Sequence, residues 1–324
     1  MLEELRTEVR NTIYEYCADP YLRDAALHAL ARPGFALNGE SHCRAGILSL
    51  EAYRAIGGDP GDAAVQAAAA IELQMESAFM FDSVADQEVD PDDGLTPAEE
   101  LALAISLLSC GNAAASQAAH RIDPTGSTSW RMQQLHRSQI EASTGQFLDA
   151  SLQKFDHATL DQGLEMTSRK AGGLGKLSAG LGASLATDDL EIVGLFEDFG
   201  SNVFTYLQLV DDLRDACPDD GHESDLRQQK KTAPLIYFYD YLSQRAPEAG
   251  NGIIPTLESD DAQMIQREFR QCGASLFCAV VAETFLNRAK SNLADLENLL
   301  GTVQNLEHLL DAIEAGSQEV LSVT

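Results

Sequence analysis

The chain has 324 residues, of which 44% are hydrophobic, enough to form a substantial core. Its 51 acidic and 22 basic residues give a formal net charge of −29, so its surface repels nucleic acid and anionic lipid. We therefore expect no nucleic-acid partner, and an anionic substrate must be captured through metal ions or a few placed cations. Polar residues interrupt every apolar stretch, which predicts no stable membrane insertion. The first 17 residues lack the basic-then-apolar layout of a signal peptide, so we expect a cytoplasmic protein.

The cysteines and histidines indicate no zinc site. Six cysteines are scattered without a C-x-x-C pair, which favours reduced thiols used as small core residues. The seven histidines show no H-E-x-x-H spacing.

Helical spacing of apolar residues recurs along the whole chain, and β-branched and aromatic runs are scarce. Short Gly/Pro/Asp clusters divide the chain into roughly ten helices joined by short loops. Thr96, Pro97 and Glu99 have the pattern of a capping box at a helix start. With no linker or low-complexity tract, we expect one all-α domain over residues 1–324, a large antiparallel helical bundle.

In the first half, an apolar helix leads into Asp82 and Asp86, which are four residues apart. The same spacing follows in the second half, where Asp211 and Asp215 come directly after Leu207, Leu209 and Val210. Carboxylates four apart share one helix face and repel each other unless a cation lies between them. Oxygen ligands of this kind suit Mg²⁺, which bridges to substrate phosphate. Two such helices facing each other across a bundle would form a diphosphate clamp.

Five further motifs follow in one order along the chain, and together they resemble the trans-isoprenyl diphosphate synthase, or polyprenyl synthetase, family across nearly its whole length. They are Gly57-Gly58-Asp59, Gly145-Gln146-x-x-Asp149, Lys170-Ala171-Gly172-Gly173-Leu174, the run from Phe199-Gly200 through Gln208 to Asp215, and Asp225-Leu226-x-x-x-Lys230-Lys231-Thr232-x-Pro234-Leu235.

The resemblance implies an isoprenoid synthase bundle with a central apolar cavity, acting on a prenyl diphosphate and forming a homodimer. Its implied metal ligands for up to three Mg²⁺ are Asp82, Asp86, Asp211 and Asp215. Asp212, Lys170 and Lys230 are further implied catalytic residues, and Arg44, Gln208 and both lysines are implied to bind diphosphate. Metal and ammonium groups together would stabilise the departing diphosphate as the allylic C–O bond ionises.

The sequence departs from the family pattern where substrate phosphate is expected. Ser83 replaces the second aspartate of the first D-D-x-x-D motif, and no lysine or arginine follows Asp86 before Arg121. The glycine-glycine-lysine of the isopentenyl diphosphate pocket reads Gly39-Glu40-Ser41. Arg44 still matches that pocket, but Met75 stands where a polar residue usually helps. The ionising half is therefore kept, while the isopentenyl half looks eroded.

This pattern favours a Mg²⁺-dependent terpene synthase that uses a C15–C25 allylic diphosphate and releases diphosphate. The alternatives are a chain-elongating geranylgeranyl or longer diphosphate synthase, a prenyltransferase to another acceptor, and, last, a silent partner subunit. Residues 90–93 formally match the D-x-D-D of protonation-driven cyclases, but they lie in a Pro/Gly-rich acidic loop, and we set that reading aside.

The residues just before Asp82 bear on substrate length. In the family, bulky residues four and five positions earlier shorten the cavity. Ala78 and Ser77 occupy these positions, which predicts room for C20 or longer chains, although Phe79 and Phe81 would restrict the cavity from neighbouring faces.

Overall fold

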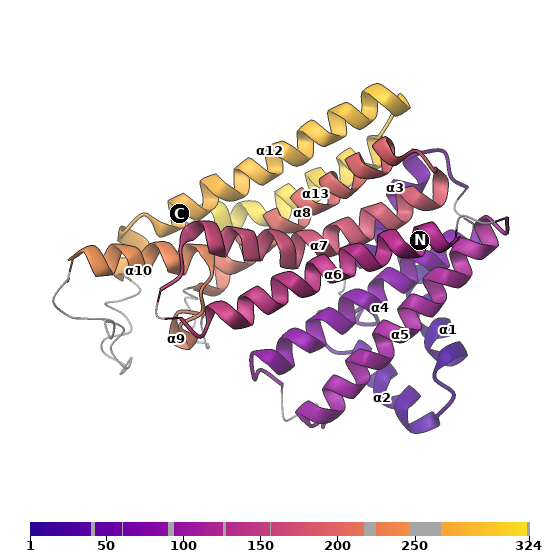
Figure 1. Cartoon of the computed structure of the whole chain (residues 1–324), viewed down its shortest axis with the longest axis horizontal. Coiled ribbons are helices and arrows are strands. Elements are labelled where there is room, and N and C mark those ends of the chain that lie inside the picture. The colour runs from indigo at the N-terminus through magenta and orange to yellow at the C-terminus, as the bar shows by residue number, and fades with distance from the viewer. Residues whose placement is uncertain are drawn as a thin grey trace. The chain divides into compact units, whose positions relative to one another are not determined.

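The structure, a computed structural model, describes residues 1–39, 43–59, 61–89, 94–125, 128–155, 157–216, 225–245 and 267–322. These residues form helices and turns, and they contain no strand. The all-α fold class expected from the sequence is confirmed. The helices are α1 (Leu2–Tyr16), α2 (Pro20–Leu30), α3 (Arg44–Ala55), α4 (Asp62–Ala85), α5 (Pro97–Ile122), α6 (Thr128–Leu152), α7 (Leu160–Ala186), α8 (Leu190–Ala216), α9 (Asp225–Gln228), α10 (Ala233–Arg245), α12 (Ala274–Leu300) and α13 (Gln304–Ser322) (Figure 1).

The chain divides into two compact units, each assembled from separate stretches of sequence. The first unit comprises residues 1–139, 174–200 and 292–307, and the second comprises 140–173, 201–291 and 308–324. The boundary falls within five helices, α6, α7, α8, α12 and α13. The expectation of a single domain over 1–324 stays a prediction.

In the first unit, α4 and α5 run side by side (Figure 1). Small residues allow this close approach. A Cβ on Gly111 of α5 would lie 2.8 Å from the carbonyl oxygen of Ala70 on α4, and Ala67 to Ala70 are at most 1% exposed. Helix α4, which leads to Asp82 and Asp86, therefore packs closely against α5 through small residues.

The start of α5 confirms the capping box predicted from the sequence. The Thr96 hydroxyl accepts a hydrogen bond from the Glu99 amide, and the Glu99 carboxylate accepts one from the Thr96 amide. Within the described residues, α5 is also the one helix long and apolar enough to cross a membrane. Length and composition alone are weak signs of a span, and the buried Leu103, Leu107 and Ala114 identify α5 as a core helix of the first unit.

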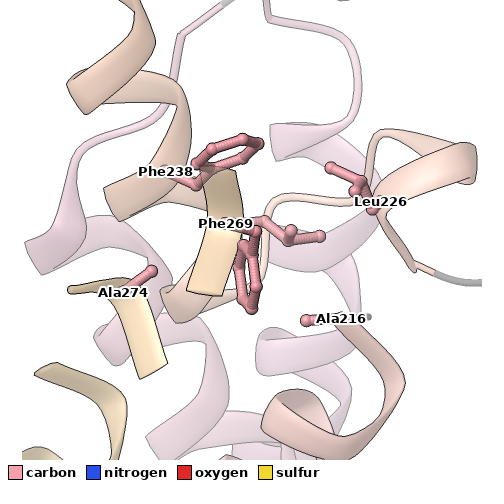
Figure 2. Packing of buried hydrophobic residues seen from close by; sticks show 6 residues of the cluster. Ala216, Leu226, Phe238, Phe269 and Ala274 are labelled. Atoms are coloured by element: carbon pink, nitrogen blue, oxygen red, sulfur yellow. The ribbon is translucent and has the colours of Figure 1, made fainter. Parts of the chain in front are cut away.

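In the second unit, a hydrophobic cluster fixes the end of α8 beside α9 and α10. Figure 2 shows Phe238 and Phe269 with Leu226, Ala216 and Ala274 around them. The two rings meet edge to face, 5.4 Å between centroids and at 80°. Since Ala216 ends α8 and Leu226 belongs to α9, this packing holds the acidic end of α8 near the segment that begins at Asp225.

Two carboxyl groups are buried on α4, one helical turn apart. The Glu72 side chain accepts a hydrogen bond from the Gly46 amide of α3, and burial raises its pKa to about 7. Burial, and then the neighbouring Glu72, raise the pKa of Glu76 well above its ordinary value, although the Ala36 amide and Arg32 oppose this. Both groups favour the protonated form inside the protein.

Glu72 gives the fold a testable pH dependence. Because the folded chain binds this proton more tightly than the unfolded chain does, the free energy of unfolding falls as pH rises from about 4.5 to about 7. Glu72→Gln keeps the acceptor for the Gly46 amide and removes the titration. We expect its stability profile to be flatter by about 3 kcal/mol over that range, measured by urea unfolding at several pH values. Parallel profiles for the two proteins would contradict the assignment.

Candidate active site

The acidic end of α8 places three aspartates in different surroundings. Asp212 is 5% exposed, while Asp211 and Asp215 reach the surface. The Gln208 side-chain amide donates to Asp212 Oδ1 at 2.8 Å, and the buried Asp212 Oδ2 has no hydrogen-bond partner among the described residues. Arg214 donates to Asp211 Oδ1 at 2.6 Å. The helix thus ends in a row of carboxylate oxygens, one of them buried and unsatisfied.

These carboxylates hold protons unusually well. Burial, and then the nearby Asp225 and Asp211, raise the pKa of Asp212 to about 8, against the hydrogen bond from Gln208 and the charge of Lys170. Partial burial and the same two aspartates raise the pKa of Asp215 to about 6, against Arg214 and Lys230. Burial is the larger cause and the neighbouring carboxylates are the smaller one, and an added cation would oppose both by stabilising the ionised carboxylates.

Lys170 on α7 lies beside this acidic row and is held by an ion pair. Its Nζ lies 2.8 Å from Asp149 Oδ2 on α6, with both side chains less than one-fifth exposed. Gly145, one turn before Asp149, makes the approach possible, since a Cβ there would lie 2.1 Å from the Lys170 backbone nitrogen. Two residues of the G-Q-x-x-D motif therefore have structural roles: Gly145 lets α6 approach α7 closely, and Asp149 forms the ion pair with Lys170.

The two glycines after Lys170 continue this close packing. A Cβ on Gly172 would lie 2.7 Å from the Ser201 hydroxyl oxygen of α8, and a Cβ on Gly173 would lie 2.6 Å from the Ala142 backbone nitrogen of α6. The α7 backbone is therefore packed tightly against both neighbours next to Lys170. The lysine projects from a rigid support.

Lys230 lies in a tight turn after α9. Its Nζ is 3.3 Å from Asp225 Oδ1, and its amide donates to the Asp225 carbonyl at 3.0 Å. Gln229 has a positive φ of 58°, a backbone conformation that glycine adopts most readily. Lys231 stabilises the turn, since its Nζ donates to the Gln229 carbonyl at 3.1 Å and lies 5.1 Å from the centroid of the Tyr239 ring.

Asp82 and Asp86 lie at the carboxyl end of α4, in the first unit. Asp86 is the C-cap residue, and its amide donates to the Asp82 carbonyl at 2.8 Å. Gln87 then turns the chain with a φ of 62°. The last turn of α4 has no basic residue, so a bound cation would stabilise these two carboxylates at the negative end of the helix. The two acidic pairs belong to different units.

The residues expected to line the cavity differ in exposure. Ser77 is 1% exposed, and its hydroxyl donates to the Ala104 carbonyl of α5 at 2.8 Å. Ala78 and Phe81 are partly buried, and Phe79 is 48% exposed with its ring edge-on to Phe35. The Ser77 side chain is thus buried in a contact between α4 and α5, so a substitution there would disturb this contact. Ala78 is therefore the better position at which to test substrate chain length.

The residues of the isopentenyl pocket motif are only partly described. Arg44, the first residue of α3, is exposed, and Met75 is 5% exposed. Glu40 and Ser41 lie outside the described residues, as does the 90–93 segment. Arg6 of α1, which the sequence did not single out, donates through Nη2 to the Gly39 carbonyl at 2.9 Å.

The described side chains contain no group of three or more His, Cys, Asp or Glu arranged to enclose a metal ion. Mg²⁺ sites of the phosphate-bridging kind need only one or two protein carboxylates, because water and substrate oxygens complete the octahedron. The all-oxygen donors of Asp211 and Asp215, with the unsatisfied Asp212 oxygen beside them, fit that kind of site.

Comparisons with known proteins agree with this geometry. The family profile described as polyprenyl synthetase matches residues 41–267, more than two-thirds of the chain. The chain belongs to the polyprenyl synthetase family. A short chain isoprenyl diphosphate synthase of Methanothermobacter thermautotrophicus is 25% identical over 265 residues, covering 77% of this chain and 79% of the relative.

Solved structures show the same fold. A geranylgeranyl pyrophosphate synthetase from Pyrococcus horikoshii matches with a TM-score of 0.76 at 22% identity, covering 93% of this chain and 96% of the other. A polyprenyl synthase from Caulobacter crescentus, crystallised with calcium and isoprenyl diphosphate, matches with a TM-score of 0.74 at 19% identity and 97% coverage of both. The isoprenoid synthase fold inferred for this polyprenyl synthetase from its motifs is thus confirmed.

Gly145 allows a test of the close packing between α6 and α7 on which the position of Lys170 depends. Gly145→Ala forces a methyl group into backbone atoms of α7, and overpacking of this kind costs about 1–3 kcal/mol. Gly194→Ala on α8 is the matched control, because a Cβ there meets nothing within 4 Å and alanine favours the helix. We expect urea unfolding to show loss of stability in the first variant and none in the second. Equal stability of both variants would show that there is room for a methyl group between α6 and α7 at Gly145, which would contradict the close packing described above.

Proposed function

We propose that this polyprenyl synthetase is a Mg²⁺-dependent, chain-elongating short-chain isoprenyl diphosphate synthase. The observation that carries the proposal is the cluster of the second unit, in which Lys170 and Lys230 lie beside the aspartates of α8. The names of the relatives support elongation over the terpene synthase favoured by the sequence alone, since those relatives are isoprenyl and geranylgeranyl diphosphate synthases.

Different residues of the chain would have different roles in breaking the allylic C–O bond. Lys170 and Lys230 would donate to oxygens of the leaving diphosphate, and the salt bridges to Asp149 and Asp225 keep both ammonium groups in place until substrate arrives. Gln208 holds the Asp212 carboxyl in orientation. Asp211 and Asp215 would hold Mg²⁺, which supplies positive charge against the leaving diphosphate. Asp82 and Asp86 of the first unit are proposed as a further pair of Mg²⁺ ligands.

Isopentenyl diphosphate, the second substrate of elongation, needs cations of its own. The motif lysine is absent, but Arg44 begins α3 and the guanidinium of Arg6 is hydrogen-bonded to Gly39, within the same motif segment. We infer that Arg6, which is 5% exposed and also ion-paired with Glu3, supplies part of the missing positive charge. Met75 and Ser83 remain departures that favour the terpene synthase alternative, in which isopentenyl diphosphate is not used.

Substrate length and assembly belong to the same proposal. The small Ala78 favours products of C20 or longer, and product mass analysis tests this. The outer surface of α6 exposes Ile140 by 66% and Phe147 by 71%, seven residues apart on one face, as suits a homodimer contact. Light scattering that finds a monomer would refute the dimer. We expect the enzyme to work in the cytoplasm.

The metal clamp predicts a strict cation requirement. Asp82→Ala and Asp211→Ala should each lower the rate of diphosphate release by roughly 10²–10⁴, by analogy with removing an electrostatic stabiliser. Asp198→Ala, an exposed aspartate on α8, should retain wild-type turnover. Full activity in EDTA, or wild-type rates in both site variants, would refute the clamp.

Elongation itself is decided by labelled isopentenyl diphosphate mixed with an allylic diphosphate. We expect the label to enter a longer prenyl diphosphate. Arg6→Met should raise the KM for isopentenyl diphosphate about tenfold or more through loss of a charge-assisted contact. Arg10→Met, at an exposed position on the same helix, should not change this KM. Release of a hydrocarbon or alcohol from the allylic substrate alone, with no incorporation of label, would restore the terpene synthase reading.

A further inference from the structure

Two cysteines of the first unit lie with their sulfur atoms in contact. Cys17 follows the last residue of α1, and Cys110 lies within α5, 93 residues later. Their Sγ atoms are 3.7 Å apart, and the two residues are 4% and 5% exposed. Nothing in the proposed catalytic chemistry uses either thiol.

Independent contacts fix the register in which these sulfurs meet. The Tyr16 hydroxyl donates to Gln117 Oε1 at 3.3 Å, and Gln117 Nε2 donates to Glu15 Oε1 at 3.3 Å. Cys110 and Gln117 are seven residues apart, so they lie on one face of α5. The end of α1 is therefore held along α5 at two successive points, one of which is the sulfur pair.

The pair is buried but lies at the end of α1, next to exposed residues. Cys17 has left the helical conformation, with φ −89° and ψ 84°, and the next residues, Ala18 and Asp19, are exposed. Opening of this helix end would expose Cys17 without unfolding α5.

We propose that Cys17 and Cys110 form an oxidisable dithiol, a modification site that reacts with low-mass disulfides and ties α1 to α5. In the first step the Cys17 sulfur attacks a disulfide RSSR, forms a mixed disulfide and releases one thiol RSH. The Cys110 sulfur then attacks the Cys17 sulfur, the Cys17–Cys110 bond forms and the second RSH leaves. The two cysteines lose two electrons and two protons, and the reagent takes up both.

The order of attack follows from the surroundings. Burial, and then the neighbouring Cys17, raise the pKa of Cys110 to about 12, and Cys110 lies in the middle of a helix. Cys17, at a helix end, is therefore the residue that meets the reagent first.

The test uses the folded full-length chain with glutathione disulfide as the reagent. After acid quenching and alkylation of free thiols, non-reducing peptide mapping should find the Cys17 peptide joined to the Cys110 peptide, with the mass of two hydrogen atoms lost. Because the bond closes a long loop, we expect the melting temperature of the oxidised chain to rise by about 5 °C and to return after reduction.

Variants separate this pair from general thiol oxidation. Cys43→Ser, at another buried cysteine of the same unit, should still give the linked peptides, whereas Cys17→Ser should not. The wild-type map decides the matter even if a variant folds poorly. Glutathione retained on a single cysteine, a linkage to any other cysteine, or no loss of mass in the native chain would overturn the proposal.

Discussion

The ion pair between Lys170 and Asp149 is the constraint on which the candidate site depends. It forms only because Gly145 lets the α6 backbone reach that of α7, and because Gly172 and Gly173 let α7 pack closely on both neighbours. The lysine is thereby fixed beside Asp212, near the carboxylates of Asp211 and Asp225. A residue with a side chain at Gly145 would displace the cation from the acidic row.

Few basic residues are available to the candidate site, and they are concentrated beside the α8 aspartates. The chain carries a net charge of −29, yet three of its six lysines, Lys170, Lys230 and Lys231, lie in the two motifs beside the α8 aspartates. Each of the first two is paired with an aspartate, and the third stabilises the turn that presents Lys230. Burial is the main cause of the raised pKa values of Asp212 and Asp215, and the neighbouring carboxylates of Asp225 and Asp211 add to it. A divalent cation with its diphosphate would complete the balance.

The sequence predicted the helical fold and the α5 capping box because both follow from local rules, namely helical periodicity and short-range caps. The family motifs also named Lys170, Gln208 and the α8 aspartates as site residues; these residues lie near one another, and their roles stay a prediction. Periodicity could not show that Ser77 donates to a neighbouring helix, since its partner Ala104 is distant in sequence. The same holds for Arg6 and Gly39, and for Cys17 and Cys110, whose contacts arise only in tertiary packing.

The departures at the isopentenyl motif favoured a terpene synthase in the sequence analysis. A cation absent from its motif position was taken to be absent from the pocket, because the sequence does not show which distant residues lie near it. The guanidinium of Arg6 on α1 is hydrogen-bonded to the Gly39 carbonyl of the same segment, a contact that motif positions cannot reveal. Lys170 and Lys230, in contrast, stand at their motif positions. The central claim is thus that this acidic site binds diphosphate only together with a divalent cation. Calorimetric titration of the folded chain with inorganic diphosphate measures this directly: the account predicts binding with Mg²⁺ present and none in EDTA, whereas equal affinity under both conditions would contradict it.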